Sequence, residues 1–322
     1  MKKFVLMIVL FGLSVCSFLT AACFLLPDAG IKKTLLGVEL IKRELLRTTP
    51  GKRIVFIGGS NVSHGIDSEM VAQAFKRPVI NMGLHAGFGL VYNLASALPY
   101  LREGDDVFLL PEDPNFFGSK CYGQLEALAA MVDVVPRGSI ELSWRHWLYL
   151  SQYFLQYGAK KVRNITDAFV NKPPIWLSYY DKYGDYVITR KTSMQEQFFE
   201  ATMIVHPYDL HPEIATSYLR AFYDACKAKG VRVFIMPPNR FDGMFEGDIS
   251  SKYVEIFLST GIPYIGDVER YAFPRDCMYD TIYHLNNKGR ALAMPRRIAD
   301  MRKAFGMGVD SRGGSRSMKG PR

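Results

Sequence analysis

The sequence lacks the closely spaced cysteines that mark zinc sites and disulfide-stapled folds. Its five cysteines lie far apart, and none belongs to a Cys-x-x-Cys pair. Two of them, Cys16 and Cys23, fall in the first apolar run. For Cys121, Cys226 and Cys277 we expect free, partly buried thiols, with one disulfide among them as the alternative. No metal site and no cofactor are predicted.

The patterns of nucleotide and nucleic-acid binding are missing as well. Gly87-Phe88-Gly89 has no third spaced glycine, and neither a Walker pattern nor the Gly-x-Ser-x-Gly elbow of the α/β-hydrolases occurs. The net charge is +9, but the basic residues are spread along the 322-residue chain and form no dense block with interleaved aromatics. We therefore expect no nucleic-acid partner.

Charge is absent from residues 4–27. At about 1.5 Å per residue this run can cross a hydrocarbon core of about 30 Å, and the flanking Lys2 and Lys3 favour an N-terminus on the cytoplasmic side. We predict a single-pass membrane protein anchored by residues 1–30, with the following domain in the periplasm or outside the cell. The alternatives are a cleaved signal peptide and lipidation, for which Thr20-Ala21-Ala22-Cys23 is a poor match.

Two short segments flank the main domain. Residues 31–51 carry apolar side chains at helical spacing among Lys, Arg and Glu, which predicts a juxtamembrane helix. That helix would either link the anchor to the domain along the surface or lie on lipid. Residues 306–322 hold few apolar side chains and are expected to form a disordered basic tail.

Residues 52–305 predict an α/β domain with a parallel sheet of about five strands, a flavodoxin-like three-layer α/β/α sandwich. The predicted strands are short and β-branched, and their hydrophobicity is continuous, as expected for strands buried on both faces. They fall at residues 53–58, 78–83, 106–111, 231–237 and 262–266. Helical stretches lie between and after them, at residues 67–76, 88–101, 212–229, 249–260 and 286–305.

The connection between the third and fourth strands is too long for a single helix. Residues 112–210 therefore form a predicted helical insertion, with helices near 121–132 and 145–160. The insertion holds all three tryptophans and many tyrosines. These side chains either stack on sugar rings or pack a helical core.

The candidate site residues follow the strand ends, where ligands bind in open parallel sheets. Gly58-Gly59-Ser60 comes after the first strand, and its glycines allow a sharp turn that can point the Ser60 N–H at a ligand. Asn81-Met82-Gly83 comes after the second strand, at the same edge. Asp280 and His284 precede the last helix, from where they can reach back to Ser60.

These segments resemble the SGNH (GDSL-like) hydrolase superfamily. The resemblance rests on "FIGGSN" after the first strand, "NMG" after the second, and a late Asp/His pair followed by "LNNKGR". It covers residues 52–112 and 230–305, and the anchored layout is similar to that of bacterial envelope members. It implies Ser60 as nucleophile, His284 as its base and Asp280 as the residue that orients the imidazole.

The resemblance also implies an oxyanion hole formed by the backbone N–H groups of Ser60 and Gly83. The family takes a further donor from an Asn in its third block, where this chain reads Pro111-Glu112-Asp113-Pro114-Asn115. Either Asn115 supplies this donor, or Glu112 has a different role.

Two other positions depart from the family pattern. Gly59 stands where the family usually has an Asp beside the nucleophile. The late Asp lies four residues before His284 instead of three, which leaves Asp276 as an alternative to Asp280.

Further polar residues at the strand ends are candidates for lining a pocket: Asn61, His64, Asn81, His85 and Glu112. We expect His64 and His85 to line the pocket or form hydrogen bonds, and not to act as second bases. The segment from His206 to His211 resembles a metal cluster, but its flanking prolines favour a loop that enters a helix.

The predicted function is that of a serine-dependent acyl hydrolase or O-acyltransferase, with acetyl as the expected group. The expected substrate is an acyl ester or carbohydrate of the cell envelope or an exported glycan, processed through an acyl-enzyme. An envelope acyl-donor protein is a candidate partner. The alternative is a catalytically degenerate SGNH-like domain that binds glycan or an assembly partner.

Overall fold

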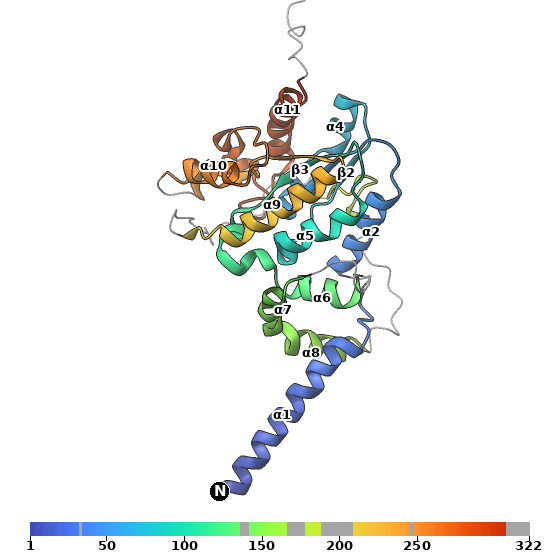
Figure 1. Ribbon diagram of the computed structural model, residues 1–322, viewed down its shortest axis with the longest axis vertical. Helices are drawn as coiled ribbons and strands as arrows, with labels where there is room; N and C mark the ends of the chain where they lie inside the picture. Colours follow the sequence, from blue (N-terminus) through green and yellow to red (C-terminus); the bar gives the residue numbers. More distant parts are fainter. Residues whose placement is uncertain (32–33, 136–141, 166–177, 188–208, 245–247, 307–322) are drawn as a thin grey trace, which may run out of the picture.

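The computed structural model describes residues 1–31, 34–135, 142–165, 178–187, 209–244 and 248–306 (Figure 1). The chain folds around a four-stranded parallel sheet with strand order β2-β1-β3-β4. Its strands are β1 (Ile54–Gly58), β2 (Val79–Asn81), β3 (Asp106–Leu110) and β4 (Arg232–Ile235). The predicted α/β class and the first four predicted strands are confirmed.

The fifth predicted strand, at residues 262–266, is wrong as a strand. The segment forms only a single parallel bridge, between Tyr264 and Ile235, the last residue of β4. Pro263 has no N–H with which to extend the ladder. Gly266, with a φ of 91°, turns the chain out of the extended conformation. The hydrophobic run is present, but its backbone allows only the two hydrogen bonds that flank the bridge.

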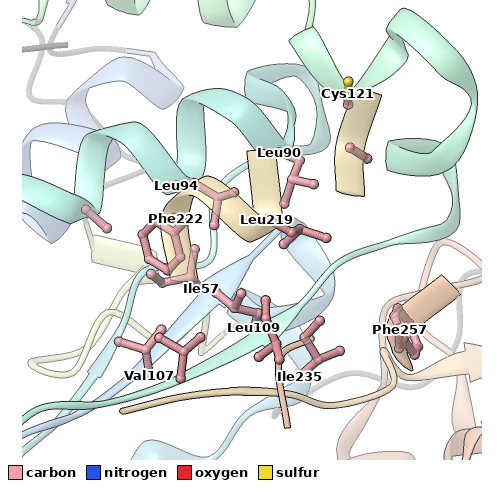
Figure 2. Close-up of a cluster of buried hydrophobic side chains, with 14 of the residues drawn as sticks. Ile57, Leu90, Leu94, Val107, Leu109, Cys121, Leu219, Phe222, Ile235 and Phe257 are labelled. Carbon is pink, nitrogen blue, oxygen red and sulfur yellow. The ribbon is translucent and has the colours of Figure 1, made fainter. Parts of the chain in front are cut away.

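Helices cover both faces of the sheet, because alternate strand residues point to opposite sides. Val55 and Ile57 of β1 belong to a cluster with α5, α9 and α10, whereas Ile54 and Phe56 belong to a second cluster with α3, α4 and α11. Figure 2 shows the first cluster. The helices are α3 (Ser60–Gly65), α4 (Ser68–Phe75), α5 (Gly89–Ala97), α9 (Glu213–Ala228), α10 (Ile249–Ser259) and α11 (Asn287–Ala304). All five helices predicted around the strands are confirmed.

The N-terminal segment forms the helix α1 (Lys2–Leu25), which projects from the rest of the chain (Figure 1). Its 24 residues include an 18-residue window of mean hydropathy 2.5. A helix of this length and composition is long and apolar enough to cross a membrane.

The helix predicted within residues 31–51 is confirmed as α2 (Leu35–Thr48), and it begins at Thr34, whose side chain accepts the Leu36 N–H. One side of α2 is packed into the domain, whereas Glu44 and Arg47 are exposed. Leu36, Lys42 and Leu46 are buried, and α2 packs against β2, α5 and α6. The physical reason is the apolar stripe of α2, which is buried most completely against the edge of the sheet.

The insertion contains α6 (Leu125–Asp133), α7 (Trp144–Leu150) and α8 (Phe154–Asn164). The expected second helix is split, because a 3₁₀ turn at Ser151–Tyr153 separates α7 from α8. Residues 178–187 lead back to the sheet, where the Asn81 N–H of β2 donates to the Tyr183 carbonyl at 2.8 Å. The expected tail, Trp176 and the first histidine of the 206–211 segment lie outside the described residues.

Candidate functional site

Ser60 lies where β1 passes into α3, at the carboxyl edge of the sheet. It is the first residue of α3, after the N-cap residue Gly59, so its N–H has no acceptor within the helix. The turn is close-packed: a Cβ at Gly58 would lie 2.6 Å from a Val62 methyl group and 2.7 Å from the Leu110 carbonyl oxygen. Glycine is therefore required there for β1 to lie against β3.

Glu112, at the end of β3, places its carboxyl group beside Ser60. Its side chain is only 3% exposed and accepts the Asn61 N–H at 2.9 Å. Burial raises the pKa of Glu112, while the Asn61 hydrogen bond and the charge of His284 oppose that shift.

The same carboxyl group explains the glycine at position 59. A Cβ on Gly59 would lie 2.5 Å from Glu112 Oε1 and 2.6 Å from its Cδ. An Asp at position 59 would clash with this group and add a second acidic side chain in a buried place. The acidic side chain beside Ser60 therefore comes from the segment that follows β3.

His284 and Asp280 are joined by a hydrogen bond of 2.6 Å between Nδ1 and Oδ1. A tight turn holds both residues: the Tyr279 N–H donates to the His284 carbonyl at 2.8 Å, and the His284 N–H donates to Thr281 Oγ1 at 3.2 Å. This turn accommodates the four-residue spacing. Asp276 is exposed and pairs with Lys288 instead, so Asp280 is the carboxylate that contacts the imidazole.

His64 stacks on His284, with ring centroids 3.7 Å apart and an interplanar angle of 8°. Burial lowers the pKa of His64 well below its usual value, and the charge of His284 lowers it further. A neutral His64 ring therefore supports one face of the His284 ring.

The ligand-type atoms of His64, Asp280 and His284 lie within 4.8 Å of one another. A metal ion binds imidazole nitrogen in the plane of the ring. Two nearly parallel stacked rings direct their lone pairs side by side, not toward a common point. The geometry of these three residues is therefore a poor fit to a metal ion.

Gly83, predicted to contribute to an oxyanion hole, packs against α3, where a Cβ would lie 2.4 Å from the Ser63 nitrogen. Its N–H donates to Asn81 Oδ1 at 2.9 Å. Asn81 also donates to the Val62 carbonyl and to Asp185, so it braces the loop and does not line a pocket. The Gly83 N–H would have to exchange this partner before it could bind an oxyanion.

Three other residues predicted to bind a ligand near Ser60 instead form hydrogen bonds within the protein. Asn115 donates its side-chain amide to the Glu112 carbonyl of its own turn at 3.0 Å. Asn61 is fully buried, and its amide donates to the Leu110 carbonyl. His85 is exposed and accepts the Gly87 N–H at 3.1 Å. In the described part of the chain, Ser60 itself makes no hydrogen bond to His284.

Sequence reasoning missed Lys42, which reaches the site from α2. Its Nζ donates to Ser63 Oγ at 2.8 Å and to the Gly83 carbonyl. Burial lowers the pKa of Lys42 to about 7, against the attraction of Asp185 and Asp181. Lys42 has apolar residues four positions away on either side in the sequence, a pattern that could have indicated its burial.

Asp185 is the second missed residue, and it comes from the returning end of the insertion. It accepts the Ser68 N–H at 2.8 Å, the Ser68 hydroxyl at 2.6 Å and the Asn81 amide at 2.8 Å. Burial raises the pKa of Asp185 to about 6. Its sequence context carries no signal of this role, because Ser68 and Asn81, which donate to its carboxylate, lie more than 100 residues away in the sequence.

The shifted pKa of Lys42 predicts a pH-dependent stability. The folded protein releases the Lys42 proton near pH 7, whereas the unfolded chain holds it until about 10.5. The unfolded state therefore binds more protons in this interval, and the Lys42 contribution to the free energy of unfolding rises with pH. We expect Lys42→Met to remove this rise in denaturant titrations at successive pH values.

The control for this measurement is Lys52→Met, which changes an exposed lysine of the same domain. This variant should keep the wild-type dependence on pH. An unchanged slope in Lys42→Met would show that Lys42 is not the group responsible.

Comparisons with known proteins find little that is similar. No family model matches the chain, and no curated protein matches it. A crystal structure of the protein YxiM from Bacillus subtilis is similar at 13% identity and a TM-score of 0.37. The match covers 80% of this chain and 58% of that one, so the chain spans less than two thirds of the length of YxiM.

Proposed function

We propose that this protein is a membrane-anchored serine hydrolase or O-acyltransferase of the SGNH type, built on a flavodoxin-like α/β/α sandwich. The observation that carries the proposal is the 2.6 Å hydrogen bond between His284 Nδ1 and Asp280. A carboxylate on one imidazole nitrogen leaves the other free to act as a base. Ser60 supports the proposal, because it begins a helix at the carboxyl edge of the sheet.

In the proposed reaction, Ser60 Oγ attacks the acyl carbon of an ester while His284 Nε2 takes the hydroxyl proton. The protonated His284, stabilised by Asp280, then gives this proton to the leaving alcohol. Water or a sugar hydroxyl attacks the acyl-enzyme in the second half, and its proton returns through His284 to Ser60 Oγ. For this to occur, the Ser60 hydroxyl must come within hydrogen-bond distance of His284 Nε2.

The oxyanion hole in this proposal uses the Ser60 N–H and a protonated Glu112. Burial raises the pKa of Glu112, which favours its neutral form, and a neutral carboxylic acid can donate a hydrogen bond. Its place beside Ser60 makes Glu112 a better second donor than Asn115, whose amide is bound to its own turn. A deprotonated Glu112 would instead repel the negative charge of the tetrahedral intermediate.

The anchor supports an extracytoplasmic site of action. Lys2 and Lys3 before α1 favour a cytoplasmic N-terminus, and the domain then lies on the opposite side of the membrane. We propose an envelope or exported glycan as the acceptor or substrate, with acetyl as the transferred group and an envelope protein as a candidate acyl donor.

A second candidate function is glycan or partner binding without catalysis. Two observations favour it: among the described residues Ser60 makes no hydrogen bond to His284, and the Gly83 N–H is already bound by Asn81. A degenerate site of this kind would retain the fold and lack an activated serine.

The test is reaction of the detergent-solubilised full chain with a fluorophosphonate, followed by mass spectrometry of its peptides. We expect one adduct on the peptide that contains Ser60, and no adduct after heat denaturation. A folded protein that stays unlabelled, or is labelled elsewhere, would overturn the serine mechanism and favour the binding function.

A further inference from the structure

The end of the anchor helix is held by the insertion. α8 packs against α1 so closely that a Cβ on Gly158 would lie 1.9 Å from the Leu19 carbonyl oxygen. Lys161 of α8 donates to the carbonyl of Cys23 at 2.6 Å and to that of Leu26 at 2.7 Å. The anchor is thus joined to the domain by a packed contact and not by a free linker (Figure 1).

The free part of α1 is too short to cross a bilayer by itself. Its side chains are exposed on all sides through Phe18. From Leu19 on, one side of the helix is covered, with Ala22 and Cys23 buried, whereas Phe24 and Leu25 stay exposed. Residues 2–18 span about 25 Å as a helix, less than the hydrocarbon core of about 30 Å. To cross the core, α1 must enter lipid as far as its contact with α8, which brings α8 to the boundary of the bilayer.

Apolar side chains are exposed at this same end of the molecule. Trp144 and Leu148 of α7 are 70% and 64% exposed and lie one helical turn apart, and Leu155 of α8 is 40% exposed. Ile165, just after α8, is 48% exposed. Exposed apolar side chains of this size are unfavourable in water and favourable at the level of lipid headgroups.

The positive charge of α7 and α8 is also suited to contact with an anionic membrane. Neither helix contains Asp or Glu, and their basic residues include Arg145, Lys160 and Arg163. The Lys160 ammonium lies 3.9 Å from the Asp28 carboxylate. Arg145 also lies over the Trp144 ring, at 5.5 Å from its centroid. Tryptophan and basic residues together are typical of segments that lie in the interface of an anionic membrane.

We propose that α7 and α8 form a second membrane contact, in which Trp144, Leu148 and Leu155 enter the headgroup region of an anionic bilayer beside α1. The contact makes the anchor rigid and holds the site at a constant height and orientation above the lipid. It depends on α1 spanning the membrane and is independent of the proposed catalytic activity.

The test measures where Trp144 lies in vesicles. The full chain carrying Trp147→Phe and Trp176→Phe, with Trp144 as its only tryptophan, is reconstituted in vesicles of phosphatidylcholine and phosphatidylglycerol. We expect lipids brominated near the headgroup end of their acyl chains to lower its fluorescence at least about twofold, as for an interfacial tryptophan.

The matched control places a tryptophan on an exposed apolar position of the domain. Leu258 of α10 is 61% exposed, and α10 lies far from α1 (Figure 1). In a variant with all three native tryptophans replaced by phenylalanine, the Leu258→Trp fluorescence should be unaffected by brominated lipid. Equal quenching at both positions, or none at position 144, would overturn the proposal.

A second measurement separates lipid from a protein partner and tests the role of charge. If Trp144 is shielded from aqueous acrylamide but not quenched by brominated lipid, a protein surface covers it and the membrane contact is wrong. If lipid is the occupant, combining Arg145→Gln with Lys160→Gln should weaken the quenching in vesicles that contain phosphatidylglycerol. Quenching that is unchanged in that variant would contradict the anionic specificity.

Discussion

Replacing Asp280 by asparagine is expected to lower the turnover of an activated acetyl ester by about 10⁴-fold, and His284→Ala by at least as much. Asp280 accepts the His284 Nδ1 proton at 2.6 Å, and asparagine would allow the other tautomer, whose Nε2 cannot take a proton. The change should appear mainly in kcat, because Asp280 stabilises the imidazolium that forms only during reaction.

The control for this prediction is Asp276→Asn. Asp276 is an acidic residue of the same loop, but it is exposed and pairs with Lys288. Its variant should keep nearly the wild-type rate. If Asp276→Asn were as inactive as Asp280→Asn, the hydrogen bond to His284 would not be the feature that matters for catalysis.

The second large effect is expected at Glu112, where alanine and glutamine should differ. Glu112→Ala removes the proposed oxyanion donor, a loss of about 10²–10³ in kcat for such groups. It also leaves the buried Asn61 N–H without its acceptor. Glu112→Gln is neutral, of similar size, and can both donate and accept, so it should stay within about tenfold of the wild type. The measurement is kcat of both purified variants, after circular dichroism has confirmed their fold.

Both outcomes for Glu112→Gln are informative. If Glu112 were itself the base for Ser60, the glutamine variant would be as inactive as the alanine variant, and the roles of His284 and Glu112 would have to be exchanged. Retained activity would support a neutral, hydrogen-bonding Glu112 and leave His284 as the base.

The pH dependence of the free energy of unfolding is an independent test of the protonation of Glu112. Burial raises the pKa of Glu112 above its usual value of 4.5. At pH values between the pKa of the unfolded chain and that of the folded protein, the folded protein therefore binds more protons. The stability that this group contributes is present below its unfolded pKa and is lost as the pH rises through the folded pKa. The Glu112→Gln variant should lack this part of the decline in the free energy of unfolding.

The fold was largely predictable because its elements are encoded locally. β1, β3 and β4 appear as continuous runs of β-branched and apolar residues between turn residues. The helices between them show apolar spacing, and α4 begins at an Asp67 whose side chain accepts the Met70 N–H. The error at residues 262–266 arose because hydrophobicity indicates burial and does not show whether the backbone of Pro263 and Gly266 can continue a ladder.

The position of the candidate site was predictable from the sequence, and the contacts within it were less so. Ser60, Asp280 and His284 stand at positions that the strand order brings to one end of the sheet. The interactions of Gly83 and Asn115 could not be predicted, because each depends on a hydrogen bond to a neighbour that competes with the expected role. The contribution of Lys42 was hidden by its placement in a segment expected to lie on the surface.

The sequence by itself determined the α/β class, the apolar helix at the N-terminus and the serine at the end of the first strand. These features follow from spacing along the chain, because 3.6-residue and continuous apolar patterns depend only on neighbouring residues.

Only the tertiary structure decided that Asp280 and not Asp276 contacts His284, that the Glu112 carboxyl group fills the space beside Gly59, and that α8 packs on α1. These choices join residues from distant segments. They depend on which loops meet at the edge of the sheet and how much room remains between them, and no pattern within a single segment records this.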